Sequence, residues 1–194
     1  MKIVIASNND HKIREIRQVF GPLTELVSMN EAGINDDIPE NEKTLEGNAL
    51  AKARYVYDLT GMNVIADDTG LEVKSLNSAP GVQSARYAGP AKDPGANIVK
   101  LWNELKNHDN YDARFRTVIA FILNGEEHLF EGIAEGRIIK EKRGTMGFGY
   151  DPVFIPEGYD ITFAEMNAES KNSISHRGEA ITKLREFIEN LNQQ

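Results

Sequence analysis

The sequence predicts an α/β fold in which helices flank a mixed central sheet. The chain has 194 residues, 40% of them hydrophobic, which is enough to bury the core of one domain or of two small lobes that share it. Short apolar runs typical of buried strands alternate with segments of helical periodicity, as in α/β proteins. A long hairpin pattern adds antiparallel strands, so we expect a mixed sheet within a single domain over residues 1–194.

The sequence pattern of the first third of the chain predicts two strands and two helices. Residues 2–6 form a short β-branched run typical of a buried strand. A helix is expected next, and Gly21-Pro22 is expected to end it. Its apolar residues recur at spacings of three and four: Ile13, Ile16, Val19 and Phe20. Residues 23–29 indicate a second strand, 30–43 a polar acidic loop, and 45–59 a second helix.

The remainder of the chain contains two strong local signals. Asp93-Pro94 is an N-cap followed by proline at the first helical position, and Asn124-Gly125 suits a type I′ hairpin turn. The predicted elements are strands over 63–67 and 71–74 around an acidic turn, a loop over 79–92, a helix from Asp93, a hairpin of 114–123 and 128–139, a glycine-rich loop over 144–156 and a final helix over 179–191.

Charge and composition narrow the functional classes. The formal net charge is −8, whereas proteins that bind duplex nucleic acid usually present a basic face, so we expect no nucleic-acid partner. The absence of cysteine excludes disulfides, zinc–thiolate sites and thiol nucleophiles, and it fits a reducing compartment. The longest strongly apolar run, residues 118–123, is far shorter than the ~20 residues of a membrane span. The first predicted strand begins at residue 2, which leaves no room for a signal peptide, so we expect a cytoplasmic protein with no membrane partner.

The segment between the first strand and the first helix is a candidate phosphate site. It consists of Ser7, Asn8, Asn9, Asp10, His11 and Lys12. A helix start offers free N–H groups and a positive dipole end, to which serine and asparagine add donors and lysine adds charge. Plain N-capping by the same residues is the alternative, and this segment alone favours capping by about two to one.

Two adjacent carboxylates, Asp67 and Asp68, follow an apolar strand. Carboxylate oxygens hold Mg²⁺ and orient a water molecule, so this pair is a candidate metal site. An aspartate-rich turn is the alternative, and the two interpretations are about equally supported. Glu40 and Glu42, in the acidic loop, could complete such a site, although taken alone they are more typical of solvated surface charge.

Two later segments hold further candidates. Residues 144–152 contain three glycines that let backbone approach a ligand, and Phe148 or Tyr150 offers an aromatic face for a base. Glycine-dense turns explain the same segment equally well. Residues 170–179 supply polar candidates: Lys171, His176 and Arg177. These side chains can contact a phosphate or a carbonyl, but a histidine–arginine pair near a helix start usually lies on the surface.

Together these segments resemble the Ham1-like family of inosine/xanthosine triphosphate pyrophosphatases. The likeness runs essentially from end to end, and six short motifs in the family's order are highly specific. They are SNNDHK (7–12), which resembles the family's S/T-x-N-x-x-K opening, EGNALAKA (46–53), ADDTGL (66–71), PGVQSARY (80–87), GFGYDP (147–152) and SHRG (175–178).

The resemblance implies two lobes around a substrate cleft, a homodimer, and Mg²⁺-dependent hydrolysis of the purine nucleoside triphosphates ITP, dITP and XTP to the monophosphate and pyrophosphate. By the matching motifs, Asp68 would be the general base and a metal ligand, and Glu40 a second metal ligand. The implied substrate contacts are Ser7, Asn8, Asn9, Asp10, His11, Lys12 and Lys52 for the triphosphate, Thr69, and Phe148, Gly149, Tyr150, Asp151, Lys171, His176 and Arg177 for the base and sugar.

Three alternatives remain. A nucleotide-binding sensor without turnover would use the basic and glycine-rich segments, but it would not require Glu40, Asp67 or Asp68, whose negative charge opposes an anionic ligand unless a metal intervenes. A glycosidase using two of the carboxylates would leave the lysines and arginine unexplained. A Maf-like pyrophosphatase would act on modified pyrimidines. The full motif set makes all three minor alternatives.

Overall fold

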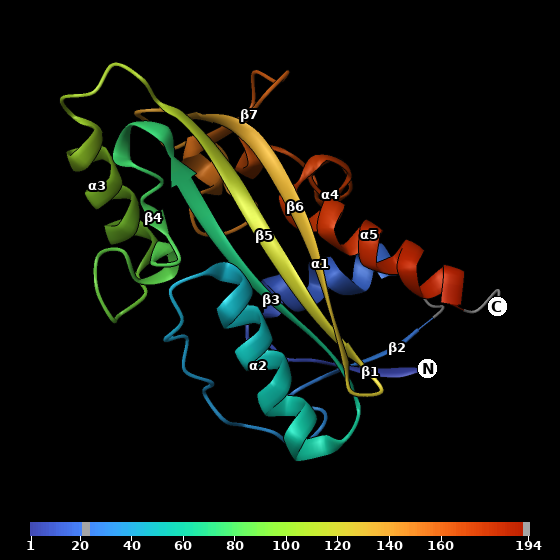
Figure 1. Cartoon of the computed structure of the whole chain (residues 1–194). Coiled ribbons are helices and arrows are strands. Elements are labelled where there is room, and N and C mark those ends of the chain that lie inside the picture. The colour runs from blue at the N-terminus through green and yellow to red at the C-terminus, as the bar shows by residue number, and fades with distance from the viewer. Residues whose placement is uncertain (21–23, 192–194) are drawn as a thin grey trace. The chain divides into compact units, whose positions relative to one another are not determined.

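The sheet is mixed, as the sequence predicts. A computed structural model describes residues 1–20 and 24–191 (Figure 1). Within them, a seven-stranded sheet has the order β2-β1-β3-β5-β6-β7, with β4 paired to β3 outside this path. β1 (Lys2–Ile5) pairs in parallel with β2 (Glu25–Ser28) and with β3 (Asn63–Val73). β6 (Glu126–Ile138) and β7 (Phe154–Pro156) pair antiparallel.

The chain clusters into two compact units. Unit 1 comprises residues 1–68, 117–132 and 177–194, and unit 2 comprises residues 69–116 and 133–176. The chain passes from one unit to the other within β3, within β5 (Asp112–Leu123), within β6, and at the start of α5 (His176–Leu191).

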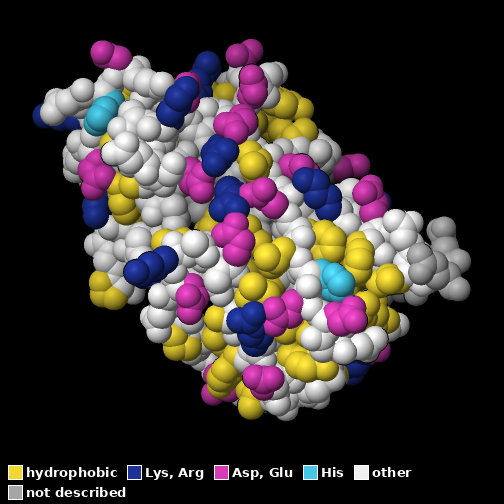
Figure 2. Space-filling model, viewed as in Figure 1, with side chains coloured by type: hydrophobic (Ala, Val, Ile, Leu, Met, Phe, Trp, Pro, Cys, Tyr) yellow, Lys and Arg dark blue, Asp and Glu magenta, His cyan; other side chains and the backbone are white. Residues whose placement is uncertain are grey.

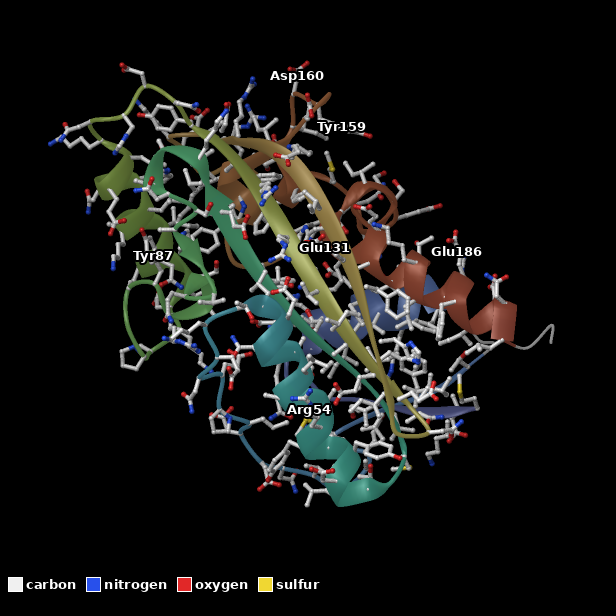
Figure 3. The ribbon with its side chains drawn as sticks, viewed as in Figure 1. Arg54, Tyr87, Glu131, Tyr159, Asp160 and Glu186 are labelled. Atoms are coloured by element: carbon white, nitrogen blue, oxygen red, sulfur yellow. The ribbon has the colours of Figure 1, made fainter. Side chains whose placement is uncertain are left out.

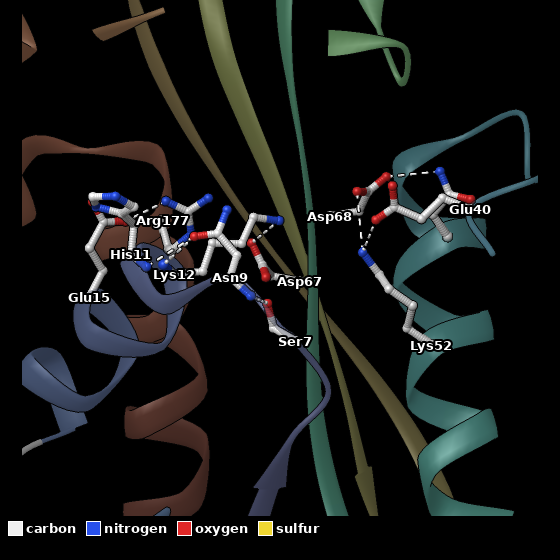
Figure 4. Close-up of polar contacts among 11 residues, drawn as sticks. Ser7, Asn9, His11, Lys12, Glu15, Glu40, Lys52, Asp67, Asp68 and Arg177 are labelled. Carbon is white, nitrogen blue, oxygen red and sulfur yellow. Dashed lines mark hydrogen bonds and ion pairs between the residues drawn. The ribbon is translucent and has the colours of Figure 1, made fainter. Parts of the chain in front are cut away.

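In unit 1, helices lie on both faces of the sheet. Because side chains alternate along a strand, Ile3 and Ile5 point to one face, where they share an apolar cluster with Ile65. Strand β5 contributes Ile119 and Phe121 to the same cluster, and the helices α1 (Asp10–Phe20) and α5 cover it. Figures 1 and 4 show α2 (Leu45–Thr60) on the opposite side of β3 from α1.

Helix α2 has well-formed ends. The Thr44 side chain caps its start by accepting from the Gly47 N–H, and Gly61 ends it in the left-handed region at φ 63°. Figure 3 labels Arg54 on α2. The helix is tied to the start of β6 by a bidentate ion pair, in which Arg54 donates to both oxygens of Glu127 at 2.6 and 2.7 Å. Its buried face carries two polar residues, Asn48 and Lys52, whose partners are described below.

In unit 2, α3 (Pro94–Leu105) packs Ile98, Leu101 and Leu105 into a second apolar cluster with β3, β5 and β6. The predicted start of α3 is confirmed, because the Asp93 side chain accepts from the Ala96 N–H. The remaining elements of this unit are short: β4 (Pro80–Gly81), α4 (Ala168–Ile174) and several 3₁₀ helices. The 3₁₀ helices are Lys74–Leu76, Ser84–Arg86, Asp151–Val153 and Phe163–Glu165.

The predicted acidic turn at 67–70 is wrong, because β3 continues through it without interruption. Gly70 is needed for packing rather than for turning, since a Cβ there would lie 2.6 Å from the Gly81 carbonyl oxygen of β4. The hairpin turn is confirmed, with positive φ at both Asn124 and Gly125. The final helix begins three residues earlier than predicted, α4 was not predicted, and the predicted helix end at Gly21-Pro22 lies outside the described residues.

Surface charges of both signs are interspersed on the face that Figure 2 shows, with no single basic patch among them. Among residues 1–20 and 24–191, no helix combines the length and the apolar composition that crossing a membrane requires.

Candidate active site

Two neighbouring carboxylates on β3 face opposite sides of the sheet within unit 1. Figure 4 shows Asp67 on the side of Lys12 and Arg177, and Asp68 on the side of Lys52 and Glu40. The separation follows from strand geometry, because successive side chains of a strand point to opposite faces. One dipeptide therefore supplies an acid to each of two charge clusters.

The cluster around Asp67 is a buried ion-pair network. Its Oδ2 lies 3.0 Å from the Lys12 Nζ and accepts from the Arg177 Nε at 3.2 Å. Arg177 also donates through Nη1 to Glu15, so its guanidinium joins two carboxylates. Burial alone would raise the pKa of Asp67, but the charges of Lys12 and Arg177 outweigh burial and hold that pKa well below its usual value. Asp67 is therefore a permanent anion at neutral pH.

The cluster around Asp68 has a different character. The Lys52 Nζ lies 2.6 Å from the Glu40 Oε1 and 3.4 Å from the Asp68 Oδ1. Asn48 donates through Nδ2 to the Asp68 Oδ2 at 3.0 Å. Burial raises the pKa of Asp68 despite the opposing charge of Lys52, and the nearby Glu40 raises it further. A carboxylate with a raised pKa accepts a proton more readily than an exposed one, as a general base must.

Side chains of the residues just before α1 cap the start of this helix, as the N-capping interpretation of the segment predicts. Asn9 Oδ1 accepts from the backbone N–H groups of His11 at 3.0 Å and Lys12 at 3.3 Å, and Ser7 Oγ accepts from the Asn9 N–H at 3.2 Å. Asn8 donates to the Asp36 carbonyl oxygen, and Asp10 is the first residue of the helix. Capping fixes the helix start and so directs Lys12 toward Asp67.

The donor set around Lys52 fits a magnesium ion that binds together with a phosphate ligand. Glu40 and Asp68 both contact one cation, the Lys52 ammonium, so their oxygens converge. Mg²⁺ is usually held in proteins by one or two carboxylates together with substrate phosphates. In the described parts of the chain, no group of three or more histidine, cysteine, aspartate and glutamate side chains could hold a metal ion by itself.

Unit 2 gathers a second cluster around Asp151. Its Oδ2 accepts from the Lys171 Nζ and from the Phe148 N–H, each at 2.8 Å, and the Asp151 and Lys171 side chains are almost fully buried. Gly147, at φ 73°, is required here, because a Cβ at this position would lie 2.1 Å from the same oxygen. The Lys171 ammonium lies 5.2 Å from the centre of the Phe148 ring. The cluster therefore combines a cation with a half-buried aromatic face.

Two of the other predicted contacts of unit 2, Tyr150 and His176, have partners within the unit. The Tyr150 hydroxyl donates to the Ser84 carbonyl oxygen at 2.9 Å. The His176 ring is stacked on Phe115, with centroids 4.6 Å apart. Thr69 and Gly149 are half-buried. His176 thus belongs to unit 2, whereas its neighbour Arg177, predicted to act beside it, lies in the Asp67 network of unit 1.

The sequence interpretation missed two members of the unit 1 clusters, Glu15 and Asn48. Asn48 carries a usable signal, because it lies four residues before Lys52 and so shares its helix face, among alanines and valine that are buried. Glu15 has no local signal, since its partner Arg177 is 162 residues away in the sequence.

The fold and these clusters define an α/β protein whose buried lysines and carboxylates suit a phosphorylated ligand with a metal ion. More narrowly, the chain belongs to the Ham1 family, whose sequence profile matches residues 3–187. The family resemblance noted in the sequence is thereby confirmed.

Relatives and solved structures agree with this assignment. The chain is 49% identical over 190 residues to a dITP/XTP pyrophosphatase of Flavobacterium psychrophilum, a match that covers 98% of this chain and 100% of that protein. It is 51% identical over 188 residues to a dITP/XTP pyrophosphatase of Porphyromonas gingivalis, a match that covers 96% of this chain and 97% of that protein. The Ham1 protein of Staphylococcus aureus has a TM-score of 0.89 at 41% identity, and a HAM1 protein of Coxiella burnetii 0.91 at 37%; each match covers 98% of this chain and 99% of the other. The predicted fold class is therefore confirmed.

Proposed function

We propose that the protein hydrolyses the non-standard purine nucleoside triphosphates ITP, dITP and XTP to the nucleoside monophosphate and pyrophosphate. Relatives at about half identity over nearly the full chain bear the name dITP/XTP pyrophosphatase. The observation that carries the proposal is the Asp68 cluster, in which a buried carboxylate with a raised pKa adjoins a second carboxylate and a lysine. This combination suits a general base beside a metal–phosphate ligand.

In the proposed reaction, a water molecule attacks the α-phosphorus and the bond to the pyrophosphate oxygen breaks. Asp68 takes a proton from the water, and Glu40 is its fellow ligand for Mg²⁺. Bound Mg²⁺ supplies charge neutralisation that makes pyrophosphate a good leaving group. Lys12 and Lys52 contact phosphate oxygens as point charges. Attraction to Asp68 and Glu40 outweighs the effect of burial and raises the pKa of Lys52, so it stays charged for this role.

Recognition of the base is assigned to the Asp151 cluster of unit 2. Phe148 stacks on the purine, and the neighbouring Lys171, held by Asp151, supplies a donor. Hypoxanthine and xanthine carry a carbonyl at position 6, which accepts from a donor, whereas the amino group of adenine leaves donor facing donor. His176 and Arg177 are further proposed contacts of the base and sugar, with Thr69 as an additional contact.

Mg²⁺ as the particular metal, a homodimeric state and a cytoplasmic location belong to the same proposal. Carboxylate oxygens are the ligands that Mg²⁺ prefers, which supports the first of these. Light scattering after size exclusion tests the dimer.

The decisive assay measures pyrophosphate release from ITP, dITP, XTP, ATP and GTP, each with Mg²⁺ and with EDTA. We expect efficient release from the first three only, and only with Mg²⁺. Equal turnover of ATP and ITP would refute the proposal. ITP binding that survives EDTA, without release of pyrophosphate under any condition, would identify the sensor alternative.

A further inference from the structure

Asn48 joins two segments of the candidate active site through one buried amide. The residue lies in the first turns of α2 and is 1% exposed. Its Nδ2 donates to the Asp68 Oδ2 at 3.0 Å, and its Oδ1 accepts from the Glu42 backbone N–H at 3.0 Å. A backbone N–H can only donate and a carboxylate can only accept, so these partners fix the orientation of the amide. No basic, aliphatic or ionised acidic side chain of similar size could make both hydrogen bonds.

The two partners of Asn48 are coupled to the proposed metal ligands. Asp68 is one of them, and its two oxygens are held separately, Oδ1 by Lys52 and Oδ2 by Asn48. The Glu42 N–H belongs to the same loop as Glu40, two residues after it. The loop packs closely on α2 at this point, because a Cβ on Gly47 would lie 2.8 Å from the Glu42 Cβ.

We propose that Asn48 is a positioning residue that sets the separation and orientation of the Asp68 and Glu40 carboxylates. The inference rests on the proposed function, in which these two carboxylates act on the metal and the water. Asn48 touches neither. It acts through Asp68 on one side and through the loop on the other, so its loss should slow turnover more than it weakens substrate binding.

The chain offers a matched control in Asn97. This residue is 4% exposed, lies on α3 in unit 2, and also makes two hydrogen bonds through one amide, both to the segment 85–88. Its Nδ2 donates to the Ala85 carbonyl oxygen at 2.9 Å, and its Oδ1 accepts from the Ala88 N–H at 2.7 Å. Asn48 and Asn97 therefore differ in the feature under test, since Asn97 contacts backbone where Asn48 contacts Asp68.

The experiment compares Asn48→Ala and Asn97→Ala in the full chain. Three quantities are measured: urea unfolding, kcat and KM for ITP with saturating Mg²⁺, and, by electron paramagnetic resonance, the dissociation constant of protein-bound Mn²⁺ in the presence of a saturating non-hydrolysable ITP analogue, which supplies the phosphate ligand. Both variants should lose stability. Asn48→Ala alone should lower kcat and weaken Mn²⁺ binding, each by about 10- to 100-fold, while KM changes by less than roughly threefold.

Asn48→Ser serves if the alanine variant fails to fold, because a single short hydroxyl cannot hold both the Glu42 N–H and the Asp68 Oδ2 in their present positions and adds no charge beside the carboxylates; its kcat should fall similarly. Wild-type-like kcat and Mn²⁺ affinity in Asn48→Ala, matching Asn97→Ala, would overturn the inference. Absence of pyrophosphate release by the unmodified protein would instead refute the proposed function, and the Mn²⁺ measurement would still decide whether Asn48 positions the carboxylates.

Discussion

Asp67→Asn should cause the larger loss of stability of the two aspartate variants, whereas Asp68→Asn should cause the larger loss of turnover. The Asp67 side chain has no exposed surface, and its Oδ2 contacts both Lys12 and Arg177. Removing its charge leaves two buried cations facing a neutral amide. Breaking a buried ion pair from one side costs about 3–5 kcal/mol, and since Arg177 keeps Glu15 we expect about 3 kcal/mol.

That loss converts to a fall in melting temperature of about 6–12 °C, at roughly 2–4 °C per kcal/mol for a chain of this size. For Asp68→Asn we expect a change within about 1 kcal/mol, because burial already disfavours the charged form and the Asn48 donor still finds an oxygen. Its kcat should fall by about a hundredfold or more, as removal of a general base usually does.

The assay pairs thermal unfolding of both variants in EDTA at pH 7 with kcat for ITP in saturating Mg²⁺. Asp67→Asn should retain more turnover than Asp68→Asn at a temperature where both are folded. A melting temperature for Asp67→Asn within about 2 °C of the wild type would correspond to a loss of roughly 1 kcal/mol or less in the free energy of unfolding. That result would refute the assignment of Asp67 to a stabilising network. Near wild-type kcat in Asp68→Asn would refute the assignment of the base.

Three further predictions concern charge and the base. The pKa of Asp67 is lowered in the fold, so its stabilisation is complete above the ordinary value of 3.8 and is lost as the pH falls through the lower folded value. The difference in melting temperature between wild type and Asp67→Asn, measured in EDTA, should therefore shrink in strong acid. Lys12→Ala should weaken ITP and XTP binding by similar factors, and added salt should weaken the wild type more than this variant; a large change in the ITP-to-GTP ratio would place Lys12 at the base. Phe148→Ala should lower kcat/KM for ITP and ATP together, whereas Lys171→Met should erode the preference for ITP; the reverse pattern would contradict the proposed pocket.

Elements with local chemistry could be predicted from the sequence, and elements held by distant partners could not. The start of α3 and the hairpin turn depend on adjacent residues, Asp93-Pro94 and Asn124-Gly125, and both are confirmed. The segment 67–70 looks like a turn because aspartate and glycine favour turns. Its true conformation depends on β4, which requires the missing Cβ of Gly70.

In the candidate site, too, residues with a local sequence signal could be predicted, whereas contacts between distant residues could not. Asp68, Lys12 and Lys52 were identified by motif, and the structure brings each of them into one of the two unit 1 clusters. The ion pair of Arg177 with Asp67 joins residues 110 positions apart, and no periodicity or composition indicates such a contact. Their roles toward a substrate remain predictions.

Because the two charge clusters depend on consecutive residues, the pairing of β3 with β1 decides which carboxylate enters which cluster. A slip of one residue between these strands would turn Asp68 toward Lys12 and Arg177 and would turn Asp67 toward Lys52. The alignment is fixed by apolar residues, with Val4 opposite Val64 and Ile5 opposite Ile65, and by the hydrogen bond from the Ala6 N–H to the Ile65 carbonyl oxygen at 2.7 Å. If Asp68 is the base that we propose, selection for catalysis reaches into the hydrophobic core, where a substitution that loosened this alignment would exchange the proposed base for a structural anion before the fold itself was lost.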